Sequence, residues 1–141
     1  MSATTGGIDC DVHPAVPGMA ALLPYFDDYW REQVTVRGID GMDLASFPPR
    51  VPAHGRADWR PASGKPGSSL AMMQSQALDG FGSRLAICNP LYGTQAVFND
   101  HFAAALARAI NDWLIAEWLD REPRLRASMT VAVQNAELAV A

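Results

Sequence analysis

The fold is inferred from the stretch Ile8-Asp9-Cys10-Asp11-Val12-His13-Pro14, because it combines a strand-like apolar pattern with two carboxylates and an imidazole. On an extended strand successive side chains point to opposite faces, so we expect Asp9, Asp11 and His13 on one face. Pro14 ends the strand, since proline has no N–H to donate and restrains the residue before it. His13 is therefore expected at the carboxyl-terminal end of the strand, where parallel α/β folds collect their functional side chains.

The composition is typical of one globular domain. The 141 residues are 49% hydrophobic and carry a net charge of −4, with a mean hydropathy of −0.02 and a pI of about 5.2. This acidic balance argues against a nucleic-acid or anionic-membrane partner. The first residues lack the pattern of a signal peptide, and no apolar run approaches the ~20 residues of a membrane span. We therefore expect a soluble, cytoplasmic protein in which Cys10 and Cys88 are buried free thiols.

Helix and strand patterns alternate after the first strand. Helical spacing of apolar residues is found over about 25–36, 69–79 and 99–121, with stops at Gly38, Gly80 and Pro123. Apolar runs predict strands over 84–88 and 126–133, and Asn135 is a candidate cap for a further helix. Residues 38–67, rich in proline and glycine, form a long insertion after the first strand. The order predicts a parallel sheet with helical crossovers. Because a sheet of three strands leaves two open edges, the chain is expected to be the beginning of a longer domain.

Four segments of the chain resemble one enzyme family. Ile8-Asp9-x-Asp11-x-His13 resembles the first-strand signature of the amidohydrolase superfamily, in the branch of the amidohydrolase-2 hydrolases and of the aminocarboxymuconate-semialdehyde and dihydroxybenzoate decarboxylases. Residues 109–114, 122–126 and 134–140 are similar to the same branch, in which an Asn-Asp-containing helix leads through a Pro-Arg turn into the third barrel strand.

This resemblance implies a (β/α)8 TIM barrel, with residues 1–141 as its N-terminal part and the remainder beyond residue 141. It implies metal-dependent hydrolysis or non-oxidative decarboxylation of a small, carboxylate-bearing substrate. Asp11 and His13 would be the first-strand metal ligands, with Asp11 in the place of the first histidine of the usual His-x-His pair. Zinc is the first choice of metal and manganese the alternative. The other ligands would come from later strands, so the 141-residue chain alone is predicted to be inactive, with a small-molecule substrate and a homo-oligomer as the candidate partners of the whole protein.

The candidate site residues also have simpler, structural interpretations. From spacing alone, a hydrogen-bonded polar strand end is favoured for Asp11 and His13 over a metal site. Asp9 is expected to brace nearby backbone. Residues of the insertion either grip a substrate carboxylate or are solvated: Arg50, His54, Arg56, Trp59, Arg60 and Lys65. Structural roles are expected for His101 at the surface, for Asn89 in the turn before Pro90, for Asn111 and Asp112, and for Trp113 and Trp118 in packing.

Two other function classes compete with the amidohydrolase resemblance. A nucleotide-binding α/β protein is disfavoured, because no G-x-G-x-x-G or G-x-x-x-x-G-K-[ST] follows a strand. A non-enzymatic association module, or a remnant of a barrel whose edges are covered by partners, remains the alternative to the enzyme. Metal binding that depends on Asp11 and His13 distinguishes the two.

Overall fold

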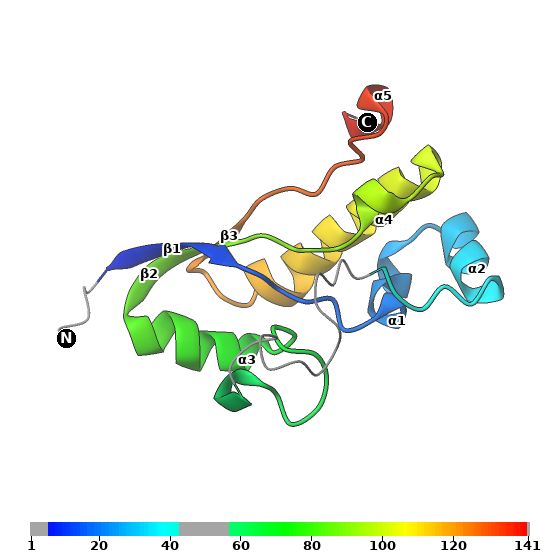
Figure 1. The fold of residues 1–141 in the computed structure, drawn as a ribbon. Helices are drawn as coiled ribbons and strands as arrows, with labels where there is room; N and C mark the ends of the chain where they lie inside the picture. The colour runs from blue at the N-terminus through cyan, green and yellow to red at the C-terminus, as the bar shows by residue number, and fades with distance from the viewer. Residues whose placement is uncertain (1–5, 43–56, 141) are drawn as a thin grey trace.

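The computed structural model describes residues 6–42 and 57–140 and has an α/β fold (Figure 1). Its three strands, β1 (Gly7–Val12), β2 (Ser83–Cys88) and β3 (Leu125–Ala127), form one parallel sheet in the order β1-β2-β3. Neighbouring parallel strands that follow each other in sequence, each joined to the next by a helical crossover, are the repeating unit of a (β/α)8 barrel. The predicted parallel sheet is confirmed.

Helices occupy the segments between the strands. After β1 come α1 (Met19–Leu22), the 3-10 turn η1 (Leu23–Tyr25), α2 (Asp28–Val36), the 3-10 turn η2 (Ala57–Trp59), α3 (Leu70–Met73) and the π-helical η3 (Gln74–Asp79). After β2 come the 3-10 turn η4 (Thr94–Ala96), α4 (Asp100–Leu114) and the π-helical η5 (Ile115–Leu119), and α5 (Ala136–Ala139) follows β3.

The helix predicted from about residue 25 begins at Asp28, because the side chain of Asp27 caps it. The later predicted helices are confirmed at their starts by side-chain caps. Ser69, Asn99 and Asn135 each accept a hydrogen bond from a backbone N–H in the first turn of α3, α4 and α5. The stop at Gly38 is confirmed by its positive φ of 64°. The stop predicted at Gly80 is wrong, because Gly80 keeps a right-handed helical backbone and the chain turns instead at Gly82, with a φ of 62°.

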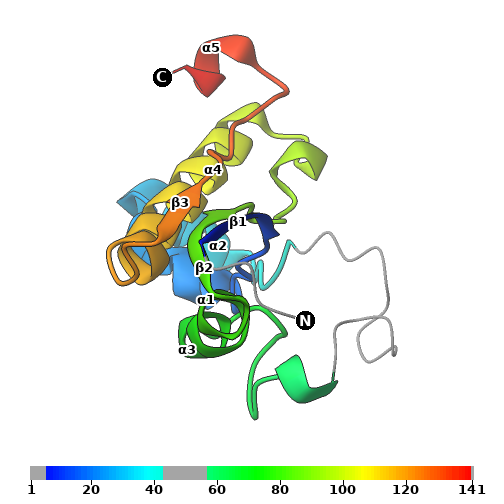
Figure 2. The same cartoon turned by 90° about the vertical axis from the view of Figure 1, so that its left-hand side faces the viewer.

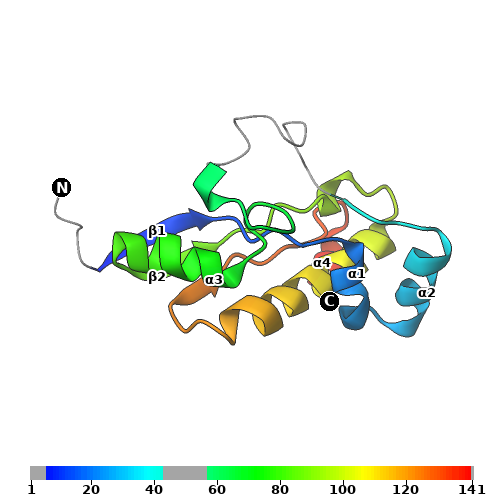
Figure 3. The same cartoon turned by 90° about the horizontal axis from the view of Figure 1, so that it is seen from below.

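The hydrophobic core lies between the sheet and one layer of helices. Seen along the strands (Figure 2) and from below (Figure 3), α3 and α4 lie on the same side of the sheet. Ala86 and Cys88 of β2 and Leu125 of β3 face these helices and are at most 2% exposed. They belong to one buried cluster with helical side chains, among them Leu78, Leu106 and Ile110. The strands therefore bury one face under helices, as the outer face of a barrel sheet does.

The third strand is shorter than predicted: it ends at Ala127 rather than near Val133. The reason is a contact between distant segments. The side-chain amide of Asn111 on α4 donates to the carbonyl of Thr130 and accepts from its N–H, both at 2.9 Å. This pair satisfies the backbone of Thr130 against a helix rather than against a strand. Ser128 still donates its backbone N–H to the carbonyl of Cys88 at 2.9 Å, and the chain leaves the sheet after it.

A network of charged side chains lies at the amino-terminal end of the sheet. Glu122, only 4% exposed, accepts hydrogen bonds from the Nε of Arg124 at 2.8 Å and from Gln74 at 3.0 Å. Arg124 also donates to Asp79 at 2.7 Å. Hydrogen bonding to Arg124 lowers the pKa of the Glu122 carboxyl to about 2, and Glu122 in turn raises the pKa of Arg124. The network joins the end of η3 to the start of β3.

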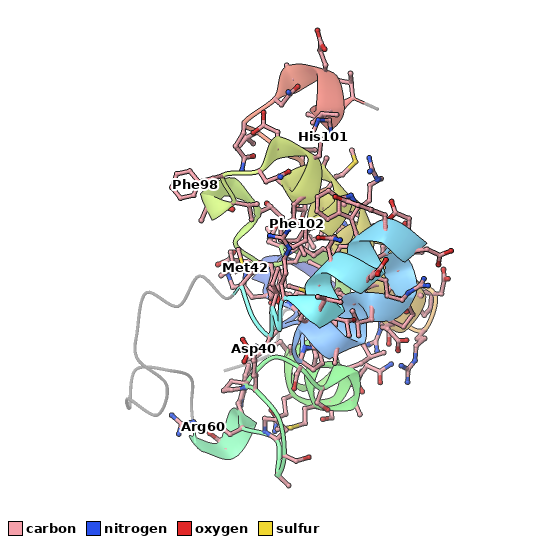
Figure 4. The ribbon with its side chains drawn as sticks, turned by 90° about the vertical axis from the view of Figure 1, so that its right-hand side faces the viewer. Asp40, Met42, Arg60, Phe98, His101 and Phe102 are labelled. Atoms are coloured by element: carbon pink, nitrogen blue, oxygen red, sulfur yellow. The ribbon has the colours of Figure 1, made fainter. Side chains whose placement is uncertain are left out.

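The insertion after β1 is described only at its two ends. Residues 43–56, which include Arg50, His54 and Arg56, lie outside the described residues. Met42, the last residue before this gap (Figure 4), accepts a hydrogen bond from the N–H of Gly93 at 2.7 Å, so the insertion starts against the loop after β2. None of the helices in the two described ranges is long and apolar enough to cross a membrane.

Candidate functional site

A β-bulge in β1 decides which side chains meet at the carboxyl-terminal end of the sheet. Asp9 pairs with Ala86 and Val12 with Cys88, so three steps along β1 match two along β2. Partners in a parallel ladder share a face, so Asp9 and Val12 both lie on the face that the helices cover. The prediction that Asp9 shares a face with Asp11 and His13 is therefore wrong, because it assumed unbroken alternation.

The same bulge corrects the expectation for Cys10. Cys10 is exposed, while Cys88 is buried. Burial, with a smaller effect from the charge of Asp9, raises the pKa of the Cys88 thiol to about 11. Cys88 is thus the inert buried thiol that the sequence predicts, whereas Cys10 lies on the open face of the strand.

Asp9 braces the bulge, as expected from the sequence. Its Oδ1 accepts a hydrogen bond from the backbone N–H of Asp11 at 3.0 Å. An aspartate that bonds the backbone two residues on holds a local turn. Asp9 therefore directs the backbone so that Asp11 projects to the open side, where its side chain is 82% exposed.

His13 lies between a backbone carbonyl and a carboxylate. Its Nδ1 is 2.8 Å from the carbonyl oxygen of Asn89, the residue that follows β2. Its Nε2 is 3.2 Å from Oδ1 of Asp11, and the His13 side chain is 41% exposed. Because a carbonyl oxygen can only accept, Nδ1 carries the proton of this hydrogen bond. In a neutral ring the Nε2 lone pair then faces a carboxylate, which is also an acceptor.

Two acceptors at this distance need a cation between or beside them, either a proton on Nε2 or a metal ion. Zinc binds histidine nitrogen and carboxylate oxygen at about 2.0–2.2 Å in tetrahedral geometry, which puts two ligand atoms about 3.4 Å apart. The distance of 3.2 Å between Nε2 and Oδ1 is close to this value. Metal-bound histidines usually donate their other ring nitrogen to a carbonyl or carboxylate, as Nδ1 does here. The pair therefore fits a divalent metal, with Asp11 and His13 as two ligands.

The rest of a ligand set is not found nearby. Within residues 6–42 and 57–140, no group of three or more His, Cys, Asp or Glu side chains is arranged to hold a metal ion. Catalytic zinc sites usually have three protein ligands and a water. Asp11 and His13 would thus be two of the protein ligands that such a site requires.

A hollow of about 220 Å³ adjoins the pair at the free edge of β1. Asp11 and His13 line one part of it, and its walls are mostly apolar, with Trp59, Met72, Met73 and Phe81 among them. The rings of Trp59 and Phe81 lie 6.1 Å apart. The hollow thus has two polar side chains, those of Asp11 and His13, with apolar space beside them, which is the usual composition of a small-molecule pocket.

The comparison with known proteins agrees with the fold. A family described as Amidohydrolase (Amidohydro_2) matches residues 8–141, from the start of the first-strand motif to the last residue. The chain belongs to the amidohydrolase family. The three parallel strands of this amidohydrolase chain are the N-terminal part of the TIM barrel expected from the resemblance. No curated protein gives a significant sequence match.

Other residues of the amidohydrolase that the sequence singled out have structural roles. The ammonium of Lys65 donates to the carbonyl of Val16 at 3.3 Å. Trp113 and Trp118 are buried, with ring centroids 6.3 Å apart, which confirms packing. His101 lies at the surface near the start of α4, beside α5 (Figure 4).

Arg60 and Phe98 are exposed on different parts of the amidohydrolase chain (Figure 4). Arg60 follows η2 in the insertion, so its expected contact with a substrate carboxylate stays a prediction. Phe98 precedes α4 and is fully exposed. The cap of α4 is Asn99, which leaves Phe98 outside the helix.

Asn89 has a role that the sequence did not predict. A turn before Pro90 was expected from it, yet its carbonyl holds His13 and its side-chain Nδ2 donates to the carbonyl of Cys10 at 2.9 Å. The only available signal was its position, directly after a strand predicted to lie beside β1. A polar residue at the carboxyl end of a neighbouring parallel strand is within reach of the first strand's last residues.

Proposed function

We propose that Asp11 and His13 are the first-strand ligands of a divalent metal ion in an amidohydrolase-type enzyme that hydrolyses or non-oxidatively decarboxylates a small, carboxylate-bearing molecule. Zinc is the proposed metal, with manganese as the alternative, because a histidine nitrogen and a carboxylate oxygen suit both ions. The remaining ligands lie outside the described residues, in a barrel that continues beyond residue 141. Family membership supports the class of enzyme.

The single observation that carries the proposal is the contact between Asp11 and His13. Nδ1 of His13 donates to the Asn89 carbonyl, so the cation that its Nε2 shares with the Asp11 carboxylate at 3.2 Å is either a proton on Nε2 or a metal ion. We assign this position to a metal ion, because the amidohydrolase family acts with one in this place of the fold. A divalent ion in this position supplies either an activated water or a Lewis acid for a substrate oxygen.

Around the metal position, the residues of this chain have separate tasks. Asp11 supplies negative charge and His13 a neutral nitrogen donor, both on a strand rather than on a loop, which keeps their spacing fixed. The apolar walls of the hollow exclude water from one side of the pair and leave room for a small molecule. Two protein ligands bind a metal weakly, so the 141-residue chain alone is proposed to be inactive.

Metal titration of the purified chain tests this proposal. With ¹⁵N-labelled histidine, Co²⁺ should shift and broaden the ring signals of His13 and leave those of exposed His101 unchanged. Asp11→Ala should abolish the effect at His13, while Asp28→Ala, which removes an exposed carboxylate on α2, should preserve it. Equal broadening at His13 and His101 would reject the assignment. A chain that binds no metal and self-associates with rising concentration would instead support the association module.

A further inference from the structure

Asn89 makes more contacts with β1 and the residue after it than a turn before a proline requires. Its backbone N–H donates to the carbonyl of Val12 at 2.7 Å, and its own carbonyl accepts from Nδ1 of His13 at 2.8 Å. Its side-chain Nδ2 donates to the carbonyl of Cys10 at 2.9 Å. Asn89 thus holds three successive parts of the segment that carries Asp11.

The side-chain bond of Asn89 meets the bulge itself. Cys10 lies between Asp9 and Val12, where the ladder between β1 and β2 loses its register. A bulge leaves backbone groups without ladder partners, and these must be satisfied by water or by a side chain. The Asn89 amide supplies the missing donor. It therefore stabilises the backbone conformation that places Asp11 on the same face as His13.

The backbone carbonyl of Asn89 acts on His13 in a different way. It belongs to the peptide plane between Asn89 and Pro90, and Pro90 has no N–H with which to anchor that plane. The same Nδ2 also lies 3.4 Å from the carbonyl of Ile87. These side-chain bonds restrain the conformation of residue 89 and hence the direction of its carbonyl. Which nitrogen of a histidine is protonated is set by the hydrogen bond that the other nitrogen makes.

We propose that Asn89 is the positioning residue of the Asp11–His13 pair: its amide maintains the bulge that presents Asp11, and its carbonyl selects the His13 tautomer with a proton on Nδ1 and Nε2 free for a ligand. The consequence for metal binding rests on the proposed function. The tautomer and the bulge do not, so they can be tested without any metal.

The test uses ring ¹⁵N chemical shifts of His13 in mildly alkaline solution, where an imidazole is neutral. It is made in the Asp11→Ala variant, because the carboxylate of Asp11 would otherwise compete for the ring proton. Asp11 is exposed, so this background should fold. His13 should be mostly in the Nδ1–H form there. Adding Asn89→Ala should shift the ring toward the Nε2–H form that a free imidazole side chain prefers.

Asn111→Ala is the matched control. It also removes an asparagine side chain with short bonds to backbone, at Thr130, so it should cost similar stability without changing the His13 tautomer. A mostly Nε2–H ring in Asp11→Ala, or a tautomer that responds equally to both asparagine variants, would overturn the proposal. If Asn89→Ala fails to fold, the His13 tautomer measured in Asp11→Ala still tests whether the Asn89 carbonyl holds the proton on Nδ1.

A second readout separates this inference from the proposed function. With Asp11 restored, Asn89→Ala should weaken Co²⁺ binding at His13 about 10- to 100-fold, the usual effect of losing an outer-shell partner, and Asn111→Ala should not. Wild-type metal binding that is unaffected by Asn89→Ala contradicts the inference and leaves the proposed function standing. The predicted tautomer in a chain that binds no metal supports the inference and contradicts the function.

Discussion

The two ends of the sheet use charged residues in opposite ways. At the amino-terminal end, Glu122 accepts from Arg124 and Gln74, and Arg124 also binds Asp79, so donors meet acceptors throughout the network. At the carboxyl-terminal end, Asp11 and His13 bring two acceptor atoms within 3.2 Å of each other. The first arrangement stabilises the fold without a ligand. The second needs a proton or a metal ion between the two atoms, and the proposed function assigns it to binding rather than to stability.

The difference extends to burial. Glu122 is 4% exposed, whereas the side chains of Asp11 and His13 are 82% and 41% exposed. In barrel enzymes the amino-terminal face serves stability and the carboxyl-terminal face carries the chemistry. Substitutions at the two ends should therefore separate loss of folding from loss of binding.

The largest expected effect is at the amino-terminal end. Glu122→Gln removes the buried carboxylate and leaves Arg124 without its buried charged partner, which should lower the free energy of unfolding by about 3 kcal/mol. Urea unfolding measures the change. Glu32→Gln, on the exposed side of α2, should change it by less than about 0.5 kcal/mol. Equal losses in the two variants would mean that the network does not stabilise the fold.

Acid should act through the same carboxylate. The pKa of Glu122 is about 2 in the folded chain against an ordinary value of 4.5. A lowered pKa gives stability that is fully present above the ordinary value and is lost as the pH falls from 4.5 toward 2. Unfolding curves measured across this window should show a drop for the wild type that is smaller in Glu122→Gln. Parallel curves would contradict the assignment.

Gly67 connects stability with the site at the carboxyl-terminal end. Its φ is 81°, and a Cβ there would come 2.8 Å from the carbonyl oxygen of His13. Gly67→Ala should cost about 2 kcal/mol and move the ring signals of His13. Gly38→Ala is the control, because Gly38 has a φ of 64° with nothing within 4 Å. It should cost about 1 kcal/mol and leave His13 unchanged. If both variants leave the His13 signals unchanged, Gly67 does not shape the site.

The smallest effect on stability is expected at the metal pair. Asp11→Ala should change the free energy of unfolding by less than about 0.5 kcal/mol, since the side chain is exposed, while it abolishes the response of His13 to Co²⁺. A loss as large as that of Glu122→Gln would show that the comparison between the two ends is wrong.

Local signals in the sequence predicted much of the fold. The cap of α5 at Asn135 was predicted correctly, because a cap acts on its own helix within a few residues and can be identified from the chain around it. The order of strands and helices likewise followed from periodicity. Asp11 and His13 were identified from a motif, and the structure brings their side chains together.

What the sequence did not predict depends on contacts between distant residues. The bulge in β1 breaks the period of two, and one of its supports is Asn89, 79 residues after Cys10. The early end of β3 depends on Asn111 in a helix. The spacing of Glu122 and Arg124 was visible, but their partners at Gln74 and Asp79 are 48 and 45 residues away. Hydrogen bonds between residues far apart in the sequence thus override the periodicity from which strands and helices are predicted.

The unequal exposure of the two cysteines gives the chain a built-in chemical reporter. Thiols react as thiolates, so Cys88, buried and with a pKa of about 11, should resist a maleimide while Cys10 reacts. Cys10 is the residue directly before Asp11. A single spin label or fluorophore could thus be attached beside the candidate metal pair in the native sequence, and quenching by added Co²⁺ would report occupancy without any engineered cysteine.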